Sequence, residues 1–277
     1  MSRPVLSPSA RVSSGGTAAF FDLDKTIIAG SSALAFSRPF LRRGLISRRA
    51  ALRSGYAQLL LLLSGADAAT MDQLRRRITA LSAGWEVATV RAVVAETLDE
   101  IVQPMVYAEA TALIAEHRVA GDEIVVLSAS GAEVVEPIAA MVGADCAVAT
   151  RMGIRNGRYS GEIEYYCYGA EKAAAARRIA DRRGYRLADC RAYSDSITDL
   201  PLLAAVGYPT VVNPDRALRR EAARRGWPVL TFAHPEPLGV RLRGPGRLAA
   251  LVVGAVGLLA AGWFSRRRAS RIRPPVR

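Results

Sequence analysis

The stretch Phe20-Phe21-Asp22-Leu23-Asp24-Lys25-Thr26 indicates the fold of this chain. An apolar run that begins at Thr17 leads into it, and such a run is typical of a short, buried parallel strand. Two acidic residues stand where that strand would end. The stretch therefore predicts a strand whose C-terminal end carries chemistry.

Strand and helix patterns alternate after residue 120. We expect strands over 123–127, 145–150, 191–193, 209–212 and 228–232, helices over 132–142, 170–183 and 215–225, and a hairpin over 151–164. Such alternation predicts an α/β fold with a doubly wound, Rossmann-like parallel sheet. Residues 31–118 follow a helical pattern without a convincing strand, which predicts an inserted α-helical cap.

These patterns predict a core over 17–30 and 119–236, with the helical cap over 31–118 between its two parts. The Ser-, Pro- and Gly-rich residues 1–16 predict a disordered leader, and 237–277 form a basic tail. Within that tail 248–265 are 18 residues without a charge, near the lower limit for crossing a bilayer. We expect a C-terminal hydrophobic helix that spans the membrane; a helix packed on the body or lying in the interface is the alternative.

Charge and cysteine content narrow the class of protein. The net charge is +13, but nine Arg and no acid follow Pro237, which leaves 29 basic against 25 acidic residues before it. The residues before this tail therefore have a net charge of only +4, which does not indicate nucleic acid as a partner. Three widely spaced cysteines match neither a metal motif nor a disulfide framework, which favours a reducing compartment.

The chain has only two lysines among 38 basic residues. Lys25 lies inside the first acidic stretch, and Lys172 stands at the start of an expected helix. A compact ammonium suits a phosphate oxygen, whereas Arg offers a planar fork. Chance retention of two lysines in an Arg-biased chain is the alternative explanation.

Asp22 and Asp24 are candidates for a covalent phosphoryl-transfer route. If the strand breaks into a loop, one carboxylate can attack phosphorus while the other protonates the leaving oxygen and later activates water. An anionic phosphate beside carboxylates needs countercharge, which an ammonium and Mg²⁺ would supply. The alternative is that this pair is an ordinary surface loop.

Further along the chain, Asp195 and Asp199 are four residues apart. If a helix begins near them, they would share one face at its N-terminus and could serve a metal. Ser128 ends an expected strand just before a helix, where its hydroxyl can hold a phosphate oxygen. Asp195 and Asp199 could instead be a helix cap and a first-turn acid, and Ser128 a helix cap, but the order of these motifs along the chain makes coincidence improbable.

On these motifs the chain resembles the haloacid dehalogenase superfamily, subfamily IB, the phosphoserine-phosphatase-like hydrolases. The motifs are Asp22-Leu23-Asp24-Lys25-Thr26, Val126-Leu127-Ser128, Lys172, and Tyr193 to Asp199. The resemblance implies Asp22 as nucleophile and Asp24 as general acid and base. It implies Mg²⁺ bound by Asp22, Asp195 and the Asp24 carbonyl, phosphate held by Ser128 and Lys172, and Asp199 supporting the metal and Lys172.

Departures from phosphoserine phosphatases concern the substrate. Ser31 stands where those enzymes usually carry a Glu for the substrate's ammonium, Ala129-Ser130 replaces a double Gly, and Ser196 stands where many relatives have Gly. We expect a Mg²⁺-dependent phosphatase for a small phosphate monoester, with phosphoserine as one candidate. The alternatives are a membrane-associated phosphatase for lysophospholipid-type esters and a non-catalytic protein that binds a membrane or nucleic acid. The expected location is at a membrane, through the C-terminal helix, with the catalytic body in the cytoplasm.

Overall fold

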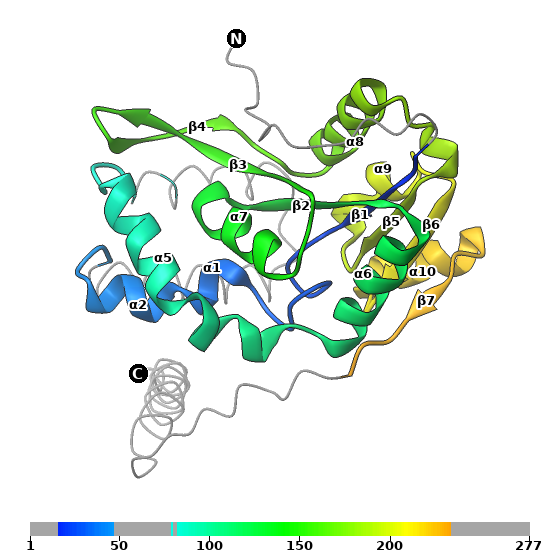
Figure 1. Ribbon diagram of the computed structural model, residues 1–277, viewed down its shortest axis with the longest axis horizontal. Coiled ribbons are helices and arrows are strands. Elements are labelled where there is room, and N and C mark those ends of the chain that lie inside the picture. The colour runs from blue at the N-terminus through cyan, green and yellow to red at the C-terminus, as the bar shows by residue number, and fades with distance from the viewer. Residues whose placement is uncertain (1–15, 47–78, 80–81, 234–277) are drawn as a thin grey trace, which may run out of the picture. The chain divides into compact units, whose positions relative to one another are not determined.

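The computed structural model of this 277-residue chain describes residues 16–46, 79 and 82–233 (Figure 1). All of them belong to one compact unit, Met1–Leu238. Residues 1–15 of the predicted leader lie outside the described residues. The whole predicted tail, including 248–265 and its hydrophobic helix, also lies outside them.

One seven-stranded sheet forms the centre of this unit, in the order β4-β3-β2-β1-β5-β6-β7. All neighbouring strands run parallel except β3 and β4. The strands are β1 (Ala18–Phe21), β2 (Glu123–Gly131), β3 (Cys146–Arg155), β4 (Arg158–Tyr165), β5 (Arg191–Ser194), β6 (Tyr208–Val212) and β7 (Val229–Leu230). The predicted α/β fold with a parallel-dominated sheet is therefore confirmed.

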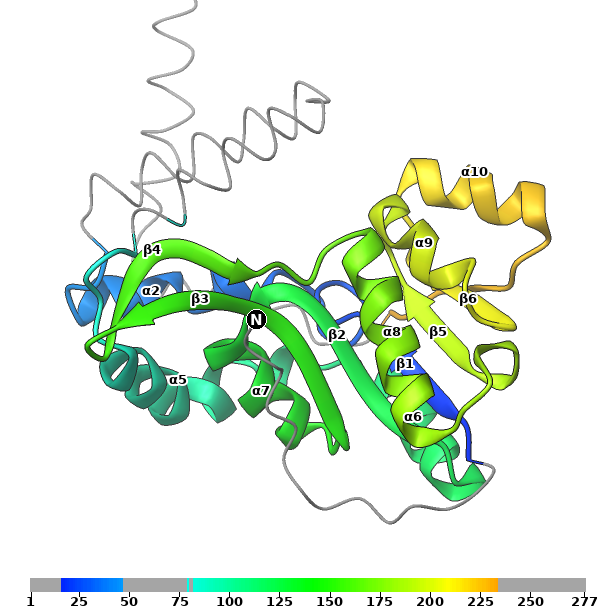
Figure 2. The ribbon, with the colours of Figure 1, turned by 90° about the horizontal axis from the view of Figure 1, so that it is seen from above.

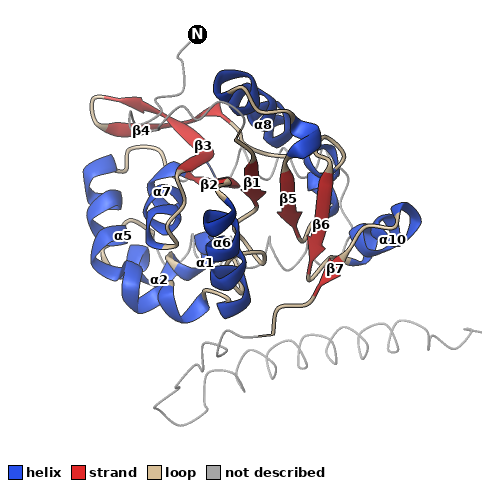
Figure 3. Ribbon diagram, turned by 45° about the vertical axis from the view of Figure 1, so that its right-hand side comes forward, coloured by secondary structure: helices blue, strands red, loops and turns tan. Residues whose placement is uncertain are grey.

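Helices cover both faces of the sheet (Figure 3). Described helices before β2 are α1 (Ser32–Ala35), α2 (Ser37–Arg42), α5 (Val87–Ile101), the 3₁₀ turn η1 (Gln103–Met105) and α6 (Ala108–Ala120). Those after β2 are α7 (Ala132–Met141), α8 (Ala170–Arg183), η2 (Leu187–Asp189), η3 (Ile197–Asp199), α9 (Leu200–Leu203) and α10 (Arg216–Arg225). The predicted cap boundary at residue 118 falls within α6, which packs against β2.

Alternating side chains of the central strands supply two separate hydrophobic clusters. Ala18 and Phe20 of β1 join one cluster with α8, α9 and α10, whereas Ala19 and Phe21 join the other with α5, α6 and α7. This alternation follows from the two-residue period of a strand. Burial on both faces explains why β1 is an uninterrupted apolar run, and it fixes the strand from which Asp22 emerges.

The predicted hairpin over 151–164 is present as the antiparallel pair β3 and β4, seen as a long curved ribbon in Figure 2. Its turn residues Asn156 and Gly157 both have positive φ, 52° and 73°, as tight hairpin turns require. Near the turn, Gly84 N donates to Tyr159 O at 2.8 Å, and Tyr159 N donates to Trp85 O at 3.0 Å. The hairpin therefore joins the segment that leads into α5 to the edge of the sheet.

The predicted location at a membrane is wrong. Among the described residues, no helix is both long and apolar enough to cross a bilayer. The longest of them, α5, has 15 residues, and at about 1.5 Å per residue it falls well short of a hydrocarbon core of about 30 Å.

Candidate active site

The loop after β1 carries both predicted catalytic aspartates. Asp22 N still donates to Tyr193 O of β5 at 2.9 Å, but the chain then turns sharply, and Ile27 N and Ile28 N both donate to Leu23 O, at 2.9 and 3.1 Å. Lys25 adopts a left-handed conformation with φ 61°, which is uncommon for a residue with a side chain. The strand therefore breaks after Asp22, and the two carboxylates take different environments.

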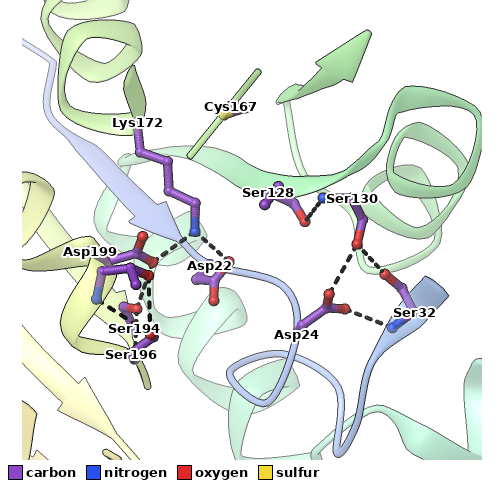
Figure 4. Close-up of polar contacts among 12 residues, drawn as sticks. Asp22, Asp24, Ser32, Ser128, Ser130, Cys167, Lys172, Ser194, Ser196 and Asp199 are labelled. Atoms are coloured by element: carbon purple, nitrogen blue, oxygen red, sulfur yellow. Dashed lines mark hydrogen bonds and ion pairs between the residues drawn. The ribbon is translucent and has the colours of Figure 1, made fainter. Parts of the chain in front are cut away.

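Asp22, Lys172 and Asp199 meet in one buried cluster (Figure 4). Lys172 Nζ donates to Asp22 Oδ1 at 2.7 Å and to Asp199 Oδ2 at 2.7 Å. Ser194 Oγ, at the end of β5, also donates to Asp199 Oδ2 at 2.7 Å. Lys172 is 3% exposed and Asp199 1%. Three elements distant in sequence thus place one cation between two carboxylates.

Burial dominates the protonation of this cluster. It raises the pKa of Asp22 well above its usual range; the Lys172 ammonium acts in the opposite direction, and the carboxylates of Asp199 and Asp195 raise the pKa further. Burial alone would lower the pKa of Lys172, but the attraction of Asp22 and Asp199 outweighs it and raises that pKa. One ammonium therefore does not balance the local negative charge.

Asp195 lies at the edge of the same cluster. Burial raises its pKa to about 6, with Lys25 acting to lower it and Asp199 to raise it. Asp195 and Asp199 do not lie together in one helix: Asp195 precedes the 3₁₀ turn η3, which Ser196 caps and Asp199 ends, and α9 starts at Leu200. The four positions from Asp195 to Asp199 therefore include a 3₁₀ turn, and the Asp199 carboxylate accepts a hydrogen bond from Lys172.

Asp215 contacts the segment after β5, in which Ser196 has an extended backbone. The backbone N of Asp215 donates to Asp195 O at 2.7 Å, and its carboxylate accepts from Ile197 N at 2.9 Å and from Leu218 N at 2.7 Å. It therefore caps α10 and also holds the loop after β5. This role of Asp215 was not predicted from the sequence, although an Asp before a helical run is a recognisable N-cap signal.

Ser128 and Asp24 lie on the other side of the site and are joined through a third residue. Ser128 is 1% exposed, and its Oγ accepts from Ser130 N at 3.2 Å. Ser130 Oγ donates to Asp24 Oδ2 at 3.0 Å, and Ser32 N donates to Asp24 Oδ1 at 2.7 Å (Figure 4). Ser130 and Ser32 were not predicted as site residues, because serines after a strand or before a helix have no distinctive pattern.

The fit of the site to Mg²⁺ depends on its oxygen atoms. Within 16–46, 79 and 82–233 no group of three or more His, Cys, Asp and Glu side chains lies close enough to hold a metal. The predicted set has two carboxylates, Asp22 and Asp195, and one backbone carbonyl. Asp199 Oδ1 is buried without a hydrogen-bond partner in the described part of the chain, and the donors are hard oxygens. The chemistry of the donors and the excess negative charge therefore fit a hard divalent cation.

The chain is similar in sequence to known hydrolases. The sequence pattern of the haloacid dehalogenase-like hydrolases matches residues 19–204. The chain is 55% identical over 261 residues to a probable phosphatase of Mycobacterium tuberculosis, covering 94% of this chain and 91% of that protein. It is 36% identical over 256 residues to a phosphoserine phosphatase of the same species, covering 91% and 81%.

A solved phosphoserine phosphatase, an analogue of its phospho-aspartyl intermediate, superimposes with a TM-score of 0.60 at 16% identity, covering 79% of this chain and 95% of the other. At that identity the likeness concerns the fold alone. The chain therefore belongs to the haloacid dehalogenase-like hydrolase family, and the predicted family and enzyme class, a phosphatase, are confirmed.

Proposed function

We propose that this enzyme hydrolyses a small phosphate monoester through an aspartyl-phosphate intermediate, with Mg²⁺ as cofactor. The carrying observation is the buried bridge of Lys172 Nζ to Asp22 Oδ1 and Asp199 Oδ2, each at 2.7 Å. A carboxylate held beside a cation at a strand end is a suitable nucleophile for an anionic phosphate.

In the first half-reaction an Asp22 carboxylate oxygen forms a bond to phosphorus, and the bond from phosphorus to the ester oxygen breaks. Asp24, in its protonated form, gives its proton to the leaving oxygen, which departs as an alcohol. Lys172 and Ser128 hold the phosphoryl oxygens.

In the second half-reaction Asp24, now a carboxylate, takes a proton from water. The water oxygen bonds to phosphorus, and the bond from phosphorus to Asp22 breaks, releasing inorganic phosphate and restoring both aspartates. Asp199 keeps Lys172 oriented throughout, because its Oδ2 accepts from the same ammonium that donates to Asp22 Oδ1.

Mg²⁺ would be held by Asp22, Asp195 and the Asp24 carbonyl, and when bound it would supply positive charge against the phosphate oxygens. The raised pKa values of Asp22 and Asp195 support this assignment, because burial and the neighbouring carboxylates disfavour their charged forms and a bound cation would offset that cost. The exposed Lys25, which lowers the pKa of Asp195, adds a second cation near the site.

Phosphoserine is the first substrate to test, since a relative at 36% identity is named a phosphoserine phosphatase. The sequence from Lys25 to Ile46 has no acidic residue to meet the ammonium of phosphoserine. The test compares kcat/KM for phosphoserine with kcat/KM for an alkyl phosphate of similar size that lacks an amino group. A preference above about tenfold in kcat/KM, or 1.4 kcal/mol, supports phosphoserine, and equal values contradict it.

Asp22→Asn tests the reaction itself. We expect p-nitrophenyl phosphate hydrolysis by the full chain with Mg²⁺ to fall at least about 1,000-fold, because the amide cannot attack phosphorus. Ser160→Ala, a change in β4 away from the site, serves as the matched control. Wild-type activity in Asp22→Asn would remove the nucleophile assignment.

A further inference from the structure

Strand β2 is irregular near its C-terminal end, where Ser130 contacts Asp24. Ser128 pairs with Ala149 and the next paired residue, Gly131, pairs with Thr150, so Ala129 and Ser130 form a bulge. Thr150 Oγ1 donates to Ala129 O at 2.7 Å and holds this bulge. Bulges redirect side chains at functional sites. Here the bulge allows Ser130 to reach Asp24 (Figure 4).

The hydrogen bonds around Ser130 have a defined direction. A serine hydroxyl has one proton, and Ser130 Oγ donates it to Asp24 Oδ2 at 3.0 Å. Ser130 Oγ in turn accepts from Ser32 Oγ at 2.8 Å, while Ser32 N donates to Asp24 Oδ1 at 2.7 Å. Both oxygens of Asp24 therefore have a fixed donor. One donor comes from the end of β2 and the other from the start of α1.

We propose that Ser130 is a positioning residue that sets the orientation of Asp24 for proton transfer to the leaving oxygen. This inference rests on the proposed role of Asp24. A general acid works only within hydrogen-bond reach of its target, and a small displacement of a reacting group lowers the rate strongly. Ser32 is fully buried and contacts both Ser130 and Asp24, so it keeps the two side chains in place.

The nature of the leaving group separates positioning from a merely structural role. An alkoxide needs the proton of Asp24 to depart, whereas p-nitrophenolate is a stable anion and departs without it. The ratio kcat/KM reports the steps up to the departure of the leaving group. For Ser130→Ala we expect kcat/KM to fall about tenfold with an alkyl phosphate. With p-nitrophenyl phosphate we expect it to fall less than about twofold.

The experiment uses the full chain with Mg²⁺ and both esters. Ser130→Thr keeps the hydroxyl and is expected to restore the alkyl phosphate rate, and Ser160→Ala is expected to leave both rates unchanged. An equal fall with both esters, or a faster alkyl phosphate reaction in Ser130→Ala, overturns the positioning role. Hydrolysis of neither ester by the wild-type chain, or full activity in Asp22→Asn, overturns the proposed function and this inference with it.

Discussion

Among single residues, Lys172 has the most unusual position, because a lysine that is 3% exposed requires paired charges. Its two partners, Asp22 and Asp199, are themselves buried, so each of the three groups depends on the others. Removing one partner of a buried ion pair costs more than the pair contributes, since the remaining charge stays buried and uncompensated.

Lys172→Met tests this dependence by removing the charge and keeping an unbranched side chain. In EDTA at pH 7.5 we expect the free energy of unfolding to fall by about 3 kcal/mol. At pH 5 the loss is expected to be smaller. Burial raises the pKa of Asp22, so without the ammonium the folded state takes up a proton that the unfolded state does not, and stability rises as pH falls.

Urea unfolding at both pH values measures this change. Arg177→Met is the matched control, because Arg177 is exposed on the same helix, α8, and is expected to change stability by less than about 0.5 kcal/mol. A Lys172→Met loss that is the same at both pH values would mean that lost packing, rather than unpaired carboxylates, causes it.

Among the elements, the start of β6 depends on a close backbone approach at Gly207. Its N donates to Leu187 O at 2.9 Å, and a Cβ built there would lie 1.7 Å from Ala188 O. No side chain fits such a distance, so this glycine allows η2 to lie against the turn that leads into β6. Because β6 pairs with β5, the contact also supports the strand that ends at Ser194.

Gly207→Ala is therefore expected to lower the free energy of unfolding by about 3 kcal/mol, because backbone must move to admit the methyl group. Gly184→Ala is the comparison: Gly184 has φ 74° but nothing within 4 Å of a built Cβ, so only backbone strain of roughly 1 kcal/mol is expected. Thermal unfolding of both variants measures the difference. Equal losses would contradict a clash with Ala188 O at Gly207.

Elements with a strong local pattern were predictable from the sequence. The helix expected over 170–183 matches α8, and the hairpin turn at Asn156-Gly157 forms as its residue types require. The bulge that presents Ser130 could not be predicted, because it is set by the register between β2 and β3. The spacing of Asp195 and Asp199 left open whether they share a helix face, because the path of this loop also depends on Asp215, distant in sequence, which bonds Asp195 O and Ile197 N.

At the scale of the whole molecule, buried negative charge gathers at the C-terminal ends of the central strands β1 and β5. Three buried carboxylates, Asp22, Asp195 and Asp199, influence one another and share the buried Lys172 and the exposed Lys25 as cations. A divalent cation bound there would stabilise the folded state alone, because the unfolded chain does not bring these groups together.

Mg²⁺ is therefore expected to raise the melting temperature of the full chain by several degrees. At 100 times its dissociation constant, a ligand adds about 2.7 kcal/mol, and for a chain of this size each kcal/mol shifts Tm by about 2–4 °C. Asp195→Asn is expected to remove most of the shift, and Na⁺ at equal ionic strength serves as the control. A shift that Asp195→Asn leaves intact would place the cation elsewhere.

The contact between Lys172 and Asp22 joins residues 150 positions apart in the chain. During synthesis Asp22 leaves the ribosome long before its cation is translated, and the cluster closes only after Asp199 follows. Long-range contacts of this kind form late in folding. Regained activity after dilution from denaturant will consequently lag behind regained helix content, so that catalysis itself reports completion of the native sheet.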